Sequence, residues 1–143
     1  MFSILSKNMV VPLLLRLCLA AIFIFHGLAL VGGEGHEWGA NWQPQDAPNR
    51  LPAIGQVAVA WGQLLGGVAL AFGFLTRLAA LGIVAIMIGA IATVHWEHGF
   101  SIQHGGYEYN FAIIVMCVCL ILGGSGPLAV DRVFHLRRRP PGQ

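Results

Sequence analysis

The chain has 143 residues, of which 57% are hydrophobic and only 10% are charged, and its mean hydropathy is +0.73. Soluble globular domains carry about 25% charged residues, so the composition excludes an ordinary soluble domain. The net charge is only +2 and comes mostly from a basic tail, residues 129–143, which we interpret as a topology signal and lipid contact rather than a nucleic-acid-binding surface.

Four apolar segments are long enough to be membrane helices, since about 20 helical residues cross a hydrocarbon core of about 30 Å. They cover residues 11–31, 52–75, 78–94 and 109–128. The first is longer than the apolar region of a typical signal peptide, so we expect it to be retained. The sequence predicts an all-α membrane protein, a single domain over residues 1–143 with four transmembrane helices in an antiparallel bundle.

The positions of lysine and arginine predict the orientation of these helices. Seven of the eight basic residues lie near the chain ends or in the turn after the second segment: Lys7, Arg16, Arg77, Arg132, Arg137, Arg138 and Arg139. Basic residues concentrate on the cytoplasmic side of multi-pass membrane proteins. We therefore expect both termini in the cytoplasm and the connections 32–51 and 95–108 on the outer side.

The first segment carries two polar side chains. It follows Pro12, which suits the first turn of a helix. Arg16 lies about a turn inside the predicted cytoplasmic boundary, where it either snorkels to the lipid head groups or forms an internal ion pair or a ligand contact. His26 lies about 15 Å further along the helix, towards the outer end.

The second segment is rich in glycine and also carries an amide near its middle. Gly62 and Gly66 form a GxxxG pattern, which we interpret as close helix packing within the chain rather than as a dimer contact. An amide is costly in hydrocarbon without a partner, so Gln63 is expected to point into the bundle. Thr76 is a candidate N-cap for the third helix.

The connection 95–108 concentrates titratable groups between two apolar segments. It contains His95, Glu97, His98, His104 and Glu108. Ionisable groups are rare and costly near hydrocarbon, so such a concentration indicates a functional site or a partner contact. Because consecutive helices are antiparallel neighbours, we expect His26, Gln56, His95 and Glu108 to converge near the outer surface.

The spacing of these residues leaves three uses open. His95 and His98 would share a helix face, but their spacing matches no specific metal-binding motif. A haem would need histidines from two helices, such as His26 and His95. A quinone head group needs hydrogen-bond partners for two oxygens and a proton route, which His95 and Glu108 beside Tyr107 would provide. We favour the quinone and expect neither a metal nor a haem.

The sequence carries no motif for an electron carrier of its own. Cys18, Cys117 and Cys119 lie within apolar segments without the spacing of a CxxC pair or metal site, so we expect inert buried thiols. No nucleotide-binding fingerprint is present either. A redox function would therefore require a partner or a soluble substrate as electron donor.

A series of short motifs resembles the DoxX family over about residues 13–131. The motifs are Leu15-Arg16-Leu17, His26-Gly27, Gln63-Leu64-Leu65-Gly66-Gly67, Gly73-Phe74-Leu75-Thr76-Arg77, Thr93-Val94-His95, Gly99-Phe100 and Gly105-Gly106-Tyr107-Glu108-Tyr109. The resemblance implies a four-helix protein of the bacterial inner membrane. Relatives include the membrane subunit of a thiosulfate:quinone oxidoreductase and members linked to redox-stress complexes.

The resemblance also implies which residues form the site. We assign His95 and Glu108 as catalytic, and Arg16, His26, Gln63 and Tyr107 as cofactor-binding, with quinone as the cofactor. Gln63 stands where many relatives carry a glutamate, and an amide cannot exchange protons as a carboxylate can. The connection 32–51 looks longer than is usual in the family, which suggests a partner surface.

Two functions from different classes follow. The chain is either a quinone-binding membrane subunit of a redox complex or a non-catalytic accessory subunit. The accessory subunit would pack against a larger complex through its glycine-rich faces and present the connection 32–51 to a membrane or periplasmic partner. A transporter is less favoured, because four helices lack the paired broken helices that mark many transport sites.

Overall fold

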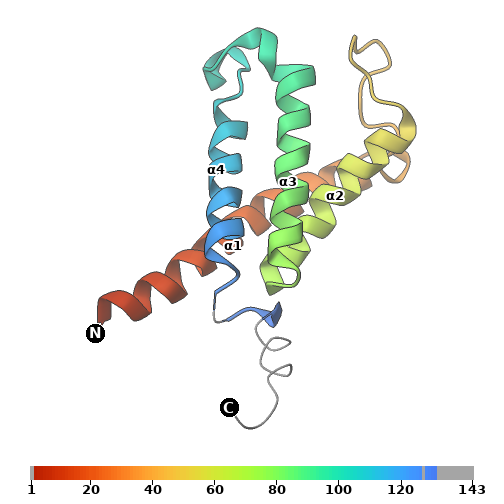
Figure 1. Cartoon of the computed structure of the whole chain (residues 1–143). Helices are drawn as coiled ribbons and strands as arrows, with labels where there is room; N and C mark the ends of the chain where they lie inside the picture. Colours follow the sequence, from red (N-terminus) through yellow and green to blue (C-terminus); the bar gives the residue numbers. More distant parts are fainter. Residues whose placement is uncertain (1, 127, 132–143) are drawn as a thin grey trace.

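The computed structural model describes residues 2–126 and 128–131, so most of the predicted basic tail lies outside the described residues (Figure 1). The described residues are all helical or irregular, without a strand. The four main helices are α1 (Phe2–Gly32), α2 (Ala53–Phe72), α3 (Thr76–Ala90) and α4 (Glu108–Gly123). The predicted all-α class and its four helices are confirmed.

Three helical stretches are long and apolar enough to cross a membrane. They are Val10–Gly32, Ala53–Phe72 and Thr76–His98, the last of which extends α3 through a π-helical and a 3-10 turn. α4 has 16 residues and rises about 24 Å, somewhat less than a hydrocarbon core. With large apolar side chains exposed on every helix, the chain is a multi-pass membrane protein.

Several helix boundaries differ from the predicted ones. α1 begins well before Pro12, so the prediction that Pro12 occupies a first helical turn is wrong. α2 ends at Phe72 because Gly73 adopts a left-handed φ of +66°, and Phe74 N donates back to Ala69 O at 2.9 Å. α4 ends at Gly123, where Gly124 turns the chain with a φ of +80°.

Consecutive helices pack as antiparallel neighbours, as Figure 1 shows for the α3–α4 pair and for α2 descending beside α1. The α1–α2 contact is the most extensive, and two glycines make it possible. A Cβ on Gly27 would lie 2.5 Å from Leu64 N, and one on Gly67 would lie 2.8 Å from Ile24 N. The two backbones therefore cross in direct contact.

The GxxxG pair serves a different interface. A Cβ on Gly62 would lie 3.1 Å from Ile86, and one on Gly66 would lie 3.5 Å from Ile83, so both glycines face α3. The interpretation as packing within the chain is confirmed, although the closest helix crossing belongs to Gly27 and Gly67.

Side chains from all four helices build the core between them. Its fully buried members are Leu19, Phe23, Leu70, Ala80, Ile83, Ile113, Cys117 and Leu120. The prediction of buried thiols holds for Cys117, whereas Cys18 and Cys119 are exposed on the outer surface of the bundle.

The bundle has two ends that differ in chemistry. The arginine end carries the α2–α3 turn, residues 73–75, and the segment that follows α4. The histidine end carries the two longer connections, residues 33–52 and 91–107. The candidate site lies at the histidine end.

Candidate functional site

A cavity of about 310 Å³ lies between the four helices at the histidine end. Its lining includes Ile22, Phe23 and His26 from α1, Gln63 from α2, Met87, Ala90 and His95 from α3 and its extension, Ile102, Gly105 and Gly106 from the following connection, and Tyr109, Asn110 and Ile113 from α4. We call this the histidine cavity. It is within the size range of small-molecule sites, and its lining is apolar with a few polar groups.

The two histidines of the cavity are each held by a backbone carbonyl. His26 Nδ1 lies 2.9 Å from Ile22 O, one helical turn earlier. His95 Nδ1 lies 2.6 Å from Gly105 O across the 91–107 connection. A carbonyl oxygen only accepts, so each Nδ1 carries the proton, and each neutral ring is left with Nε2 as a hydrogen-bond acceptor.

The end of α3 positions His95. After Ala90 the helix widens into a π-helical turn, Ile91–His95, which the sequence patterns did not predict. Thr93 O accepts a 2.7 Å hydrogen bond from Asn49, so the long 33–52 connection holds this turn. Single π-helical turns often occur at functional sites because they displace side chains from the regular helix face.

Two amides and the hydroxyl of Tyr109 complete the polar lining. Gln63 is half-buried and lines the cavity, which confirms that it points into the bundle. Asn110 is only 6% exposed, and its Nδ2 donates to Met87 Sδ at 3.4 Å. Asn110 was not among the site residues predicted from the sequence. The available signal was an amide in the first turns of a membrane helix, where a polar group needs a partner.

Tyr107 and Glu108 lie beside the cavity and do not line it. Tyr107 stacks on Trp96 with ring centroids 5.9 Å apart. Glu108 is exposed, and its Oε2 accepts a 3.1 Å hydrogen bond from Ile102 N. This bond caps the short 3-10 helix Ile102–His104, and the next residue, Gly105, supplies the carbonyl that holds His95.

Arg16 lies at the opposite end of the molecule. It is 1% exposed, and its guanidinium donates to Leu70 O at 2.9 Å, Ala71 O at 3.0 Å and Ser125 O at 2.9 Å. Snorkelling to lipid head groups is therefore wrong. The side chain points inwards, but the partners found are main-chain carbonyls rather than the ion pair or ligand of the alternative. The guanidinium satisfies carbonyls at the end of α2 that have no partner within the helix.

The N-terminus of α3 is also capped from a distance. Asp131 accepts hydrogen bonds from Leu75 N at 2.6 Å and Thr76 N at 2.9 Å. The prediction that Thr76 is the N-cap is wrong, because the cap position falls on Leu75 and the carboxylate of Asp131 supplies the acceptor. Thr76 is instead fully buried.

Gln56 binds the long connection rather than the cavity. Its side chain accepts from Gln43 N at 2.9 Å and donates to Leu51 O at 2.9 Å, while Trp42 Nε1 donates to Gln56 O at 3.0 Å. Of the four residues expected to converge at this end, only His26 and His95 share the cavity. Gln56 and Glu108 each organise a connection next to it.

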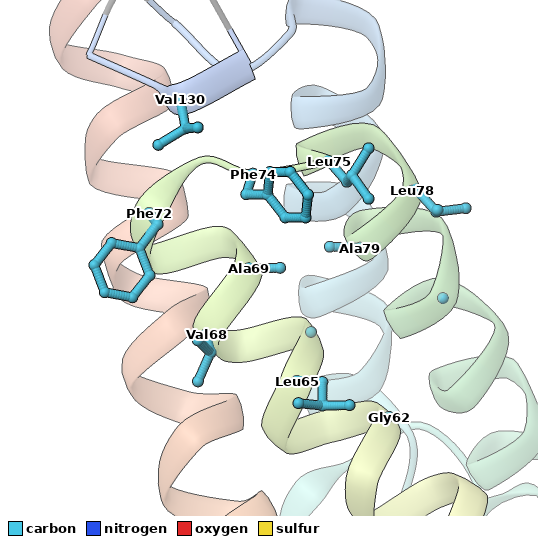
Figure 2. Close-up of a pocket in the computed structure, with 12 residues that line it drawn as sticks. Gly62, Leu65, Val68, Ala69, Phe72, Phe74, Leu75, Leu78, Ala79 and Val130 are labelled. Carbon is cyan, nitrogen blue, oxygen red and sulfur yellow. The ribbon is translucent and has the colours of Figure 1, made fainter. Parts of the chain in front are cut away.

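A larger groove of about 630 Å³ runs along α2 and α3 towards the arginine end (Figure 2). Figure 2 shows Val130 and Phe74 at one end of this groove and Leu65 and Gly62 at the other. Every residue that lines it is apolar, so it offers no side-chain hydrogen bond to a polar ligand. The histidine cavity is therefore the better candidate site despite its smaller volume.

The chemistry of the histidine cavity is that of hydrogen bonding and proton exchange. Two imidazoles and two amides from four helices surround a small volume with apolar walls. Among the described residues, no three His, Cys, Asp or Glu side chains come close enough together to hold a metal ion. The fold and this cavity define a multi-pass helical membrane protein with a small polar site at one end of its bundle.

The chain belongs to the DoxX family, whose model matches residues 11–96. It is similar to an uncharacterized protein of Haemophilus influenzae, with 33% identity over 125 residues that cover 85% of this chain and 82% of the relative. It is also similar to a Bacillus subtilis protein named "Putative oxidoreductase CatD", with 32% identity over 119 residues that cover 83% of each chain. No solved structure matches the chain.

Proposed function

We propose that this DoxX protein is a membrane subunit of a redox complex and binds the head group of a quinone or quinol in the histidine cavity. The observation that carries the proposal is the joint presence of His26, Gln63, His95 and Asn110 around one cavity. The name of the Bacillus subtilis relative supports a redox function.

The residues present suit such a head group. A quinone ring carries two oxygens on opposite sides and therefore needs polar partners on two walls of its site. The cavity has histidines on α1 and at the end of α3 and amides on α2 and α4, with apolar side chains between them. Its volume of about 310 Å³ suits a ring rather than a ring with a long tail.

When bound, the quinone would supply the electron chemistry, and this chain would supply positioning and proton exchange. His95 and His26 are the candidate proton-exchanging groups, since a ring nitrogen of an imidazole can accept a proton and release it again. Gln63 and Asn110 would fix the orientation of the ring through their amides. Electrons would pass to or from a partner protein or a soluble substrate, as the sequence patterns suggest.

Three residues that we assigned from the sequence would act indirectly. Glu108 and Tyr107 would support the loop that holds His95, and Arg16 would stabilise the far end of the bundle. We further propose that the protein lies in the bacterial inner membrane with both termini in the cytoplasm, which would put the histidine cavity near the outer face.

A second candidate function is a non-catalytic accessory subunit, and the 33–52 connection favours it. Trp38 is 76% exposed, while its carbonyl accepts a 3.0 Å hydrogen bond from Trp61 Nε1. A large aromatic side chain held on a well-bonded loop suits a protein interface. In this case Trp38→Ser would release a partner in native gels and leave any bound quinone unchanged.

Quantifying quinone in the solvent extract of gently purified protein by mass spectrometry tests the first proposal. We expect about one quinone per chain, and a large loss in His95→Leu. His104→Leu is the matched control, because His104 is exposed and does not line the cavity. A wild-type extract with no quinone above the bulk-lipid background would refute the proposal.

A further inference from the structure

We infer that the histidine cavity selects the reduced, doubly hydroxylated form of its ligand over the oxidised dicarbonyl form. This inference rests on the proposed function and goes beyond it, because it names which of the two redox forms the site recognises. It comes from the proton positions that the backbone imposes on the two histidines.

A backbone carbonyl fixes the tautomer of each histidine ring. His26 Nδ1 and His95 Nδ1 each lie within hydrogen-bond distance of a carbonyl oxygen, at 2.9 and 2.6 Å. Both neutral rings must therefore be protonated at Nδ1, and both keep a lone pair at Nε2. The two histidines of the cavity are acceptors of hydrogen bonds from a ligand.

The other polar side chains of the cavity differ from the histidines in their hydrogen-bonding capacity. Asn110 donates one N–H of Nδ2 to Met87, which leaves its second N–H and its Oδ1 for a ligand. The amide of Gln63 makes no hydrogen bond among the described residues, so it can donate or accept, as can the hydroxyl of Tyr109. These groups can adapt to either redox form, whereas the two Nε2 atoms only accept, and no carboxylate is among the described lining residues.

The two redox forms of the ligand differ in whether they can donate hydrogen bonds to the Nε2 atoms. A hydroquinone carries two hydroxyl donors, each of which can donate to one Nε2 atom. A quinone of the same shape carries two carbonyl acceptors, which would face the imidazole lone pairs and leave these polar groups without partners. A site built to hydrogen-bond a hydroxyl strongly rejects an analogue that lacks it. No electron transfer is needed for this selectivity, which is a property of binding alone.

The test compares three ring compounds of similar shape on the purified full-length protein in detergent micelles under anaerobic conditions. The compounds are 1,4-dihydroxynaphthalene, 1,4-dimethoxynaphthalene and 1,4-naphthoquinone, and equilibrium dialysis against empty micelles corrects for partitioning. We expect the dihydroxy compound to bind at least about tenfold more tightly than the other two. A tenfold preference corresponds to an upward shift of about 30 mV in the potential of a bound two-electron couple.

Asparagine substitutions isolate the Nε2 atoms. The Nδ2 of asparagine occupies nearly the position of the Nδ1 of histidine, so His95→Asn retains the donor to Gly105 O and removes only the distal acceptor. His26→Asn does the same towards Ile22 O. We expect each variant to keep its unfolding temperature and lose the preference, and His104→Asn to keep both.

The outcomes separate this inference from the function on which it rests. Equal affinity for the three compounds, tighter binding of naphthoquinone, or a preference that survives in both asparagine variants would overturn the inference and leave a quinoid site in place. Absence of saturable binding of any of the three compounds would overturn both.

Discussion

The two ends of the bundle use their polar side chains in opposite ways. At the arginine end, Arg16 donates three hydrogen bonds to main-chain carbonyls, and Asp131 accepts two from main-chain amides. At the histidine end, His26 and His95 each use one ring nitrogen on the backbone and keep the other. Arg16 and Asp131 therefore stabilise the fold, whereas each histidine keeps one ring nitrogen that can bind a ligand.

This difference gives a criterion for interpreting polar residues in membrane helices. A buried charge is costly unless hydrogen bonds satisfy it, and Arg16 is satisfied by the protein itself. Polar groups with unused capacity around a cavity need a ligand or water. Residues of the first kind should therefore affect stability when changed, whereas residues of the second kind should affect binding.

Replacing Arg16 should produce the largest effect. Arg16→Met removes three hydrogen bonds and leaves the carbonyls of Ala71 and Ser125 without their partner, while Leu70 O keeps its bond from Gly73 N at 3.2 Å. We expect a loss of about 3–5 kcal/mol in the free energy of unfolding, measured by denaturant titration in detergent, since each carbonyl left without a partner costs about 1–3 kcal/mol. Arg77→Met is the control, because Arg77 is exposed at the same end. Similar losses in the two variants would break the distinction between the ends.

A substitution at the crossing of α1 and α2 should have the next largest effect on stability. A Cβ on Gly67 would approach main-chain atoms of Ile24 and Phe23 to within about 3 Å, and backbone cannot rotate away as a side chain can. Gly67→Ala should lower the unfolding free energy by about 1–3 kcal/mol. Gly82→Ala should be harmless, since nothing lies within 4 Å of its Cβ position. A Gly67→Ala variant with an unchanged free energy of unfolding would show that the two helices cross less closely.

Asn110 provides the sharpest contrast with Arg16, because both are buried polar residues. Asn110→Leu removes a single weak hydrogen bond to a sulfur atom and adds an apolar side chain, so the unfolding free energy should change by less than about 1 kcal/mol. Head-group affinity, measured by the same dialysis, should fall about tenfold. A strongly destabilised variant with unchanged affinity would assign Asn110 to the fold instead.

The sequence predicts the fold well because hydrophobic segment length and glycine placement act locally. Segment length gives four helices, and Gly73 and Gly124 end α2 and α4 a few residues before the predicted limits. What local patterns cannot predict are bonds between distant segments. Asp131 caps α3 from 55 residues away, and Arg16 reaches Ser125 across 109 residues.

The candidate site was predictable to a similar extent. His26, Gln63 and His95 share one cavity because antiparallel neighbours bring their helix ends together. Asn110 was missed because its burial depends on how α4 rotates against α3. The distinction between lining the cavity and supporting it, which separates His95 from Glu108, depends on the path of the 91–107 connection. Helical periodicity carries no information about that path.

Substitutions of Glu108 should have the smallest effect on head-group binding. They test whether a residue beside the cavity acts on the ligand directly or only through His95. Its carboxylate accepts from Ile102 N and so supports the connection whose Gly105 carbonyl holds His95. If it acts only through His95, Glu108→Ala should weaken head-group binding about two- to threefold, since one exposed hydrogen bond is worth little. Glu108→Gln should restore the wild-type affinity, because the amide oxygen still accepts.

A proton-relay function of Glu108 predicts a different pattern. An amide cannot exchange protons, so Glu108→Gln would then slow quinone-linked turnover as much as Glu108→Ala while leaving binding unchanged. Measuring affinity and turnover in both variants separates the two functions. Glu97→Gln is the control, because it removes an exposed carboxylate on the same connection. Rescue of both quantities by glutamine would place Glu108 among the residues that hold the site. Proton exchange would then be left to the two histidines, whose Nε2 atoms are not used by the fold.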